Sequence, residues 1–211
     1  MRKWYPAIVI ALAFVFSAVV YGRLPERVPV HWNLSGEVDR MGSRLEGAFL
    51  LPLLALALWG AMRVFPRIDP RKANYERFRG TYDFLVNSLI TMFVLFHVVV
   101  LGNALGWPLP LTRIVPALIG LFLIAIGNVL PRARSNWWIG VRTPWTLSSE
   151  HVWARTNRLA GYLLMGTGVV LLIFAALASP WALTMGAVAA AVIAVFSITY
   201  SYWLWRKEKR A

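Results

Sequence analysis

The chain has 211 residues, of which 59% are hydrophobic and only 15% charged, with a mean hydropathy of +0.60. Soluble domains are about 45–50% apolar and about 25% charged, so this composition predicts a membrane protein and excludes a sizeable water-soluble domain. The formal net charge of +13 therefore reports on membrane topology rather than on direct nucleic-acid binding, which we do not expect, and the lack of cysteine excludes disulfides and thiolate sites.

Apolar runs predict six membrane spans, since about 20 such residues cross a hydrocarbon core of about 30 Å. Pro52 is expected in the first turn of the second span, where a missing N–H costs little. The first span follows Arg2 and Lys3 as a signal peptide would, but no small-residue cleavage site follows it, so we keep it as a span. The predicted spans are 4–21, 49–62, 84–105, 114–130, 159–178 and 182–204. The predicted fold class is an all-α integral membrane protein with six transmembrane helices.

The distribution of basic residues predicts the orientation. Of the 22 Lys and Arg residues, 17 fall on the side of both termini and 5 on the other side. Because cytoplasmic loops carry the excess of basic residues, both termini are predicted to be cytoplasmic, with short amphipathic helices on that face. We divide the chain into a two-helix unit, residues 1–66, and a four-helix unit, residues 67–211, within one compact membrane domain. Stripes of small residues, such as Gly161 and Gly168, predict close packing within the bundle or a homo-oligomer face, and both alternatives stay open.

Loop one, residues 22–44, is predicted to face outward. Pro25 and Pro29 hold the residues before them extended, which predicts a strand-like segment ending near Trp32. Asn33 and Gly36 are typical of a turn.

Polar side chains around this turn form a candidate external binding site. We predict that His31, Asn33, Gly36 and Asp39 bind a ligand outside the membrane. A divalent metal is the weaker hypothesis, because the ligand spacing is irregular and no second histidine is near. A hydrogen-bonded turn packed on the bundle is the simpler alternative.

Residues 24–39 carry a sequence motif, Leu-Pro-Glu-Arg-Val-Pro-Val-His-Trp-Asn-Leu-Ser-Gly-Glu-Val-Asp. This motif resembles the signature of a bacterial domain of unknown function, DUF1648. That domain stands at the start of the SdpI-type immunity proteins, which act against the sporulation-delaying peptide toxin.

Loop two, residues 63–79, is predicted to be cytoplasmic. Asp69 and Pro70 suit the start of a helix, as its cap and first residue. From there a helix is predicted to follow the inner leaflet, with Tyr75, Phe78 and Tyr82 on one face. Attraction to lipid phosphate is sufficient to explain its basic residues. The segment 68–78 also resembles the matching part of the immunity family.

His97 is the only ionisable side chain in the middle of a predicted span. We favour a neutral histidine that is hydrogen-bonded across helices over a proton or ligand site. All nine acidic residues lie outside the spans, whereas ion-coupled transporters usually keep ionisable groups at mid-membrane depth. Secondary transport is therefore the weaker hypothesis.

Loop four, residues 132–158, holds the densest motif of the chain. Gly140 and Thr143-Pro144 predict a turn, and Ser148 or Ser149 can cap a following helix. The neighbouring Ser, Glu and His residues give poor support for a catalytic triad, because a triad requires convergent geometry.

We predict an inner-surface docking or switch element in loop four. Arg142 is its key residue, because a guanidinium can bridge a carboxylate or a phosphate bidentately. The candidate docking residues are Asn136, Trp138, Gly140, Arg142, Thr143, Trp145, Thr146, Trp153 and Asn157. The same segment resembles the hallmark of the SdpI-type immunity family, with one departure at Asn157, where the family pattern more often has histidine.

The resemblance implies a non-enzymatic membrane immunity or signalling protein of the bacterial cell membrane, without cofactor or metal. The implied partners are membrane lipids, a membrane-active peptide toxin outside and a small DNA-binding repressor held at the inner face. The alternative is a transporter, a lipid flippase or a lipid-modifying protein that uses the basic cytoplasmic loop.

Overall fold

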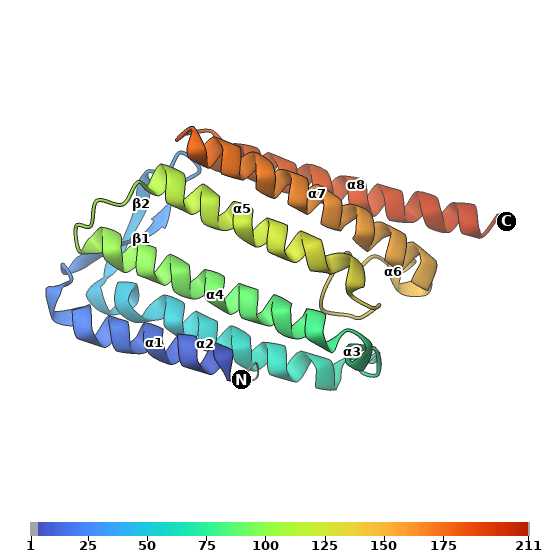
Figure 1. The fold of residues 1–211 in the computed structure, drawn as a ribbon, viewed down its shortest axis with the longest axis horizontal. Coiled ribbons are helices and arrows are strands. Elements are labelled where there is room, and N and C mark those ends of the chain that lie inside the picture. Colours follow the sequence, from blue (N-terminus) through green and yellow to red (C-terminus); the bar gives the residue numbers. More distant parts are fainter. Residues whose placement is uncertain (1–3, 211) are drawn as a thin grey trace.

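The structure, a computed structural model, describes residues 4–210 and shows long helices lying side by side, with a β-hairpin at one end of the bundle (Figure 1). The long helices are α1 (Tyr5–Val20), α2 (Arg44–Ile68), α4 (Arg79–Ala104), α5 (Leu111–Val129), α7 (Glu150–Ala176) and α8 (Ala182–Glu208). The short elements are β1 (Arg27–Trp32), β2 (Val38–Ser43), α3 (Asn74–Arg77), α6 (Pro144–Ser148) and two 3-10 turns, Tyr21–Arg23 and Leu130–Arg132. Arg2 and Lys3 lie outside the described residues.

Within residues 4–210, six helices are long and apolar enough to cross a membrane, which confirms that there are six spans. The hairpin lies at the end of the bundle opposite α3, α6 and the C-terminal end of α8 (Figure 1). The side of the membrane on which each end lies stays a prediction, as does the division into residues 1–66 and 67–211. Within the bundle α4 packs against α1 and α2, while α7 packs against α5 and α8.

Loop one is not helical, so a strictly all-α fold is wrong in this region. β1 was predicted as an extended segment, and it pairs antiparallel with β2, which was not predicted. β2 is exposed at five of its six positions and therefore carries no apolar pattern that marks a strand. Val28 anchors the hairpin, because it is fully buried and a Cβ on Gly47 would lie 2.5 Å from its Cγ1.

α2 is longer than predicted and begins at Arg44, where the Ser43 hydroxyl accepts a hydrogen bond from the Glu46 backbone N–H at 3.1 Å. Pro52 therefore lies inside the helix, and its expected place in the first turn is wrong. A proline inside a helix cannot donate to the carbonyl four residues earlier, which here belongs to Ala48. That carbonyl oxygen instead accepts from the Ser17 hydroxyl of α1 at 2.6 Å.

The same compensation occurs at the other end of α2. Pro66 cannot donate to the Met62 carbonyl, and the Tyr82 hydroxyl of α4 donates to that oxygen instead. Inside lipid, where water is absent, a freed carbonyl is satisfied by donors from neighbouring parts of the protein, and both prolines of α2 have such a donor. The two prolines thus fix where α1 and α4 pack against α2.

His97 belongs to this polar contact between helices. Its Nε2 lies 2.8 Å from the hydroxyl of Ser17, and both side chains are fully buried. One serine therefore connects α1, α2 and α4. The prediction that His97 is hydrogen-bonded across helices is confirmed.

Glycines bring α5 and α7 into close contact. A Cβ on Gly168 would lie 2.5 Å from the Gly120 carbonyl oxygen, and a Cβ on Gly161 would lie 2.6 Å from the Gly127 carbonyl oxygen. Backbone contact this close needs residues without side chains on both helices. The small residues Gly161 and Gly168 therefore pack within the bundle.

This packing predicts that Gly168→Ala destabilises the protein. The new methyl group would force the two backbones apart, at a cost of about 1–3 kcal/mol. Gly166→Ala is the matched control, since no atom lies within 4 Å of a Cβ there, and alanine favours a helix by up to about 1 kcal/mol over glycine. Unfolding in mixed detergent and SDS micelles measures both variants. Equal stability of the two would contradict the close packing of α5 on α7.

Candidate functional site

The tip of the hairpin is a turn held by Asn33. Its Oδ1 accepts from the backbone N–H groups of Ser35 at 2.9 Å and Glu37 at 3.0 Å, and its Nδ2 donates to Glu37 Oε2 at 3.1 Å. Gly36 has a φ of +81°, a conformation that side chains rarely adopt. The predicted turn at Asn33 and Gly36 is confirmed, and Asn33 acts in it as a structural residue.

His31 and Asp39 form a second polar pair next to the turn. His31 Nδ1 lies 2.6 Å from Asp39 Oδ1, and the two side chains are 63% and 42% exposed. Exposure leaves both groups free to contact an external ligand. Within residues 4–210, no cluster of three His, Asp or Glu side chains could hold a metal ion. The ligand-binding role of the four predicted residues stays a prediction.

A cavity of about 530 Å³ lies between the hairpin tip and four helices. His31, Asn33 and Gly36 contribute to its lining at the hairpin. The rest of its wall is mainly apolar and comes from α4, α5, α7 and α8, with the side chains of Phe96, Val115, Leu171, Leu183 and Ala187 among others. Ligand pockets in proteins typically measure about 300–1,000 Å³. The cavity can therefore take an apolar ligand of several side chains' size, with polar groups at one edge.

At the other end of the bundle, two buried amides fold loop four. Asn136 Oδ1 accepts from the backbone N–H groups of Trp138 at 2.8 Å and Ile139 at 2.7 Å. Asn157 Oδ1 accepts from the Val141 N–H at 2.8 Å. Gly140, between these contacts, has a φ of +104°, and a Cβ there would lie 2.5 Å from Asn157 Oδ1. The motif thus needs these two amides and this glycine to form its turn.

Threonines continue this folded segment into α6. The Thr143 hydroxyl caps α6 by accepting from the Thr146 N–H at 3.1 Å, and the Thr146 hydroxyl oxygen accepts from the Thr143 N–H at 2.8 Å. Thr143 Oγ1 also lies 3.0 Å from Ser201 Oγ of α8. Ser149 then caps α7 through the Val152 N–H, as predicted for one of the two serines. These contacts fix loop four between α7 and α8.

Asp69 ties loop four to loop two. It is 2% exposed, and its Oδ2 accepts from the Tyr75 hydroxyl and the Trp137 N–H, both at 2.9 Å. Burial is the main cause that raises the pKa of Tyr75, and the hydrogen bond to Asp69 raises it further. The Tyr75 hydroxyl therefore stays protonated and can donate. The prediction that Asp69 caps the start of a helix is wrong. Asp69 is the C-cap of α2, and the next helix, α3, begins only at Asn74.

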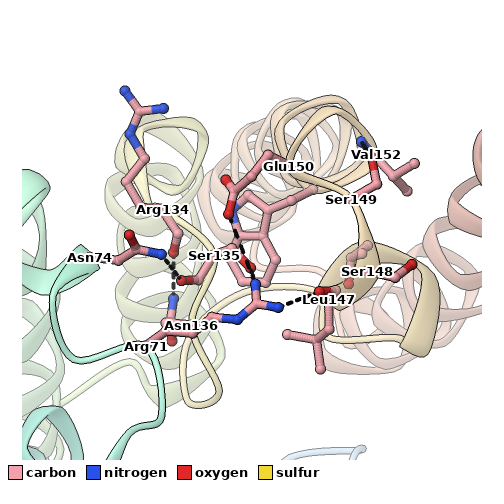
Figure 2. A network of polar contacts seen from close by, with 12 residues as sticks. Arg71, Asn74, Arg134, Ser135, Asn136, Leu147, Ser148, Ser149, Glu150 and Val152 are labelled. Carbon is pink, nitrogen blue, oxygen red and sulfur yellow. Dashed lines mark hydrogen bonds and ion pairs between the residues drawn. The ribbon is translucent and has the colours of Figure 1, made fainter.

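Arg71 makes the second connection between the loops (Figure 2). Its guanidinium donates to the Ser135 hydroxyl and the Leu147 carbonyl, and it lies 3.9 Å from Glu150 Oε1 at the start of α7. Asn74 adds a hydrogen bond from its Nδ2 to the Ser135 carbonyl at 2.7 Å. The contacts of Asp69, Arg71 and Asn74 with loop four were not predicted, although all three residues lie in the segment that resembles the family.

The predicted docking residues fall into three groups by burial. Five of them are at most 6% exposed and bond within the protein, namely Asn136, Thr143, Thr146, Trp153 and Asn157. Arg142 is exposed, and its Nη1 donates to the Trp137 carbonyl at 2.6 Å. Trp138, Gly140 and Trp145 are half-buried. In this conformation a partner at this end of the bundle can reach Arg142 and the exposed Trp137, whereas the buried residues shape the loop beneath them.

The six spanning helices and these two ends define a multi-pass cell membrane protein. The profile of the SdpI/YfhL protein family matches residues 132–201, which include loop four. The profile of DUF1648, a domain of unknown function, matches residues 8–56, which include the hairpin. The chain is thus similar to the SdpI/YfhL family in loop four and to DUF1648 around the hairpin, which confirms the resemblance found in these two loops.

Individual relatives agree with this assignment. The chain is 26% identical over 200 residues to the immunity protein SdpI of Bacillus subtilis (strain 168), covering 95% of this chain and 94% of that protein. It is 26% identical over 80 residues to the uncharacterized membrane protein YbgB of the same organism, covering 38% of this chain and 78% of that protein. An uncharacterized protein of Archaeoglobus fulgidus is 42% identical over 50 residues, covering 24% and 27% of the two chains. No solved structure gives a significant match.

The contacts of Asp69 predict that Asp69→Ala destabilises the protein. The change removes the acceptor of the Trp137 N–H and leaves the buried Tyr75 hydroxyl only a 3.4 Å contact with Asn136 Oδ1, at a cost of about 1–3 kcal/mol for each donor. Asp69→Asn keeps one acceptor oxygen and should lose less. Glu208→Ala removes an exposed acid at the same end of the bundle and should change stability by less than about 0.5 kcal/mol. The measurement is thermal unfolding in detergent. Equal stability of Asp69→Ala and Glu208→Ala would contradict the role of Asp69.

Proposed function

We propose that this protein is a membrane immunity protein that protects its cell by binding a membrane-active peptide at the hairpin end. Similarity to a protein named as an immunity protein over 95% of the chain supports this function. The proposed peptide binding is based on the apolar cavity of about 530 Å³ beneath the exposed hairpin turn.

The cavity suits the chemistry of such a peptide. Peptides that act on membranes have an apolar face and a polar face. The apolar side chains of a bound peptide would lie among Phe96, Leu171 and Leu183, while its polar groups would meet His31 and Asp39. Binding alone removes the peptide from the lipid, so we propose a non-enzymatic mechanism. The charge distribution, which predicts that the hairpin faces outward, gives an external peptide access to this site.

Filling the cavity is predicted to reduce protection. Ala187 lines the cavity, so Ala187→Trp places a large ring there. This ring should displace at least one apolar side chain of the peptide. A buried side chain is worth about 1.5–3 kcal/mol, so peptide binding should weaken about tenfold or more. The measurement is the survival of toxin-exposed cells that express each variant at equal membrane abundance.

Ala191→Trp is the matched control, because Ala191 lies one turn further along α8 and does not line the cavity. It should protect as the unchanged protein does. His31→Ala combined with Asp39→Ala should also reduce protection without lowering abundance. Full protection by Ala187→Trp would exclude the cavity as the peptide site.

We further propose that loop four retains a small DNA-binding repressor when the peptide is bound. The exposed guanidinium of Arg142 and the 49% exposed ring of Trp137 support this proposal, because they offer a charged and an aromatic contact on one rigid loop. The buried hydrogen bonds of Asn136 and Asn157 would keep that surface in place.

Arg142→Lys tests this second step. A lysine keeps the charge but lacks the planar fork that can hold a carboxylate bidentately, so retention of the repressor should fall. Toxin-dependent recruitment of a fluorescently tagged repressor of the same host to the membrane is the measurement, and Arg142→Ala should be no less severe. Arg134→Lys is the control, as Arg134 is exposed in the same loop. Normal recruitment by Arg142→Lys would reject Arg142 as the docking residue.

A further inference from the structure

A second cavity, of about 430 Å³, lies at the opposite end of the bundle among α1, α2, α3 and α4. Four cations line it, namely Arg63, Arg67, Lys72 and Arg79. Two acids, Glu76 and Asp83, also contribute, so the lining has a net charge of +2. The cavity is separate from the hairpin site and from loop four.

Among the described residues, these four cations have no acidic partner. Across residues 4–210, none of them lies within 4.0 Å of a carboxylate oxygen, whereas three other ion pairs form. Arg63 is positioned by its contact with Trp59, whose ring centre lies 5.4 Å from the guanidinium carbon. The positive charges around the cavity are therefore available to an anion from outside the protein.

The position of the cavity limits what that anion can be. Arg63 and Arg67 lie in the last turns of α2 and Arg79 in the first turn of α4, so the cations stand where two spans end. Pro6, Met62 and Val86 add apolar wall from the spanning helices. A charged rim above an apolar wall at the end of the spans matches a lipid, whose phosphate and chains lie at these same two depths.

We propose that this cavity binds one anionic phospholipid, with its phosphate held by Arg63, Arg67 and Arg79 and its chains along Pro6, Met62 and Val86. Guanidinium groups suit this task, because each can give two parallel hydrogen bonds to phosphate oxygens. The net charge favours an anionic lipid over a zwitterionic one. The site does not rest on the proposed immunity function.

Native mass spectrometry of the full chain in detergent tests the proposal. The probes are phosphatidylglycerol, phosphatidylcholine with the same chains, and glycerol phosphate without chains. Phosphatidylglycerol should be retained at about tenfold or higher occupancy over the other two. The triple variant Arg63→Gln, Arg67→Gln, Arg79→Gln should lose this preference. The triple variant with lysine at these three positions keeps the charge and should retain part of the preference for phosphatidylglycerol. A loss seen only in the glutamine variant is then due to the lost charge and not to misfolding.

The control is Lys207→Gln, Lys209→Gln, Arg210→Gln, which removes three cations from the exposed tail of α8 at the same end of the bundle. Its lipid retention should remain within about twofold of the unchanged protein. If both glutamine variants lost phosphatidylglycerol equally, the lipid would be held by diffuse attraction to surface cations, and the proposal would be overturned. Equal occupancy by glycerol phosphate would mean a site for soluble phosphate, and equal occupancy by phosphatidylcholine would mean that charge plays no part. Either result would overturn the proposal.

Discussion

A backbone carbonyl that loses its helical donor inside a membrane span needs a donor from elsewhere in the protein, and this constraint shapes how α1, α2 and α4 assemble. Pro52 and Pro66 each leave a carbonyl of α2 without its helical donor. Ser17 of α1 and Tyr82 of α4 supply the missing donors. The buried carboxylate of Asp69 extends the same principle to the loops, because it accepts hydrogen bonds from both loop two and loop four. The contacts of Ser17, Tyr82 and Trp137 join residues that lie 31, 20 and 68 positions apart in the sequence.

The two ends of the bundle differ in what they leave accessible. The hairpin end exposes a His–Asp pair and an apolar cavity, a combination suited to an amphipathic ligand. At the opposite end, the buried side chains of Asp69, Asn136 and Asn157 hold the loops by hydrogen bonds, and cations are exposed at the surface. α4, α5, α7 and α8 line the cavity near the hairpin, and α7 and α8 also hold loop four. Because α7 and α8 contribute to both ends, we propose that a peptide bound in the cavity shifts these helices and so changes loop four.

Much of the fold could be predicted from the sequence, because membrane spans depend on length and apolar composition, which are local properties. The turn at Asn33 and Gly36 and the cap at Ser149 were predictable for the same reason. β2 was not, because its exposed residues carry no apolar alternation and it forms only by pairing with β1. Asp69 was misplaced, since an Asp-Pro pair suits a helix start locally, whereas two of its three side-chain partners lie 6 and 68 residues away.

The candidate sites were only partly predictable. The motif in loop four was found by its composition, yet sequence could not separate residues that build the loop from residues that face a partner. Asn136, Asn157 and Arg142 are all polar. Only their burial shows that the two amides build the loop and that Arg142 is accessible. The cavity beneath the hairpin could not be predicted at all, because its wall combines residues from four helices and a turn.

Photocrosslinking from the cavity tests the central claim that a membrane-active peptide binds beneath the hairpin. A benzophenone amino acid is placed at Leu183, which lines the cavity, or at Val192, which is 60% exposed on the same helix and does not line it. The peptide toxin is added from outside to cells that express each variant. We expect crosslinks to the peptide from position 183 and few or none from position 192. Equal crosslinking at both positions, or none at position 183, would contradict the claim.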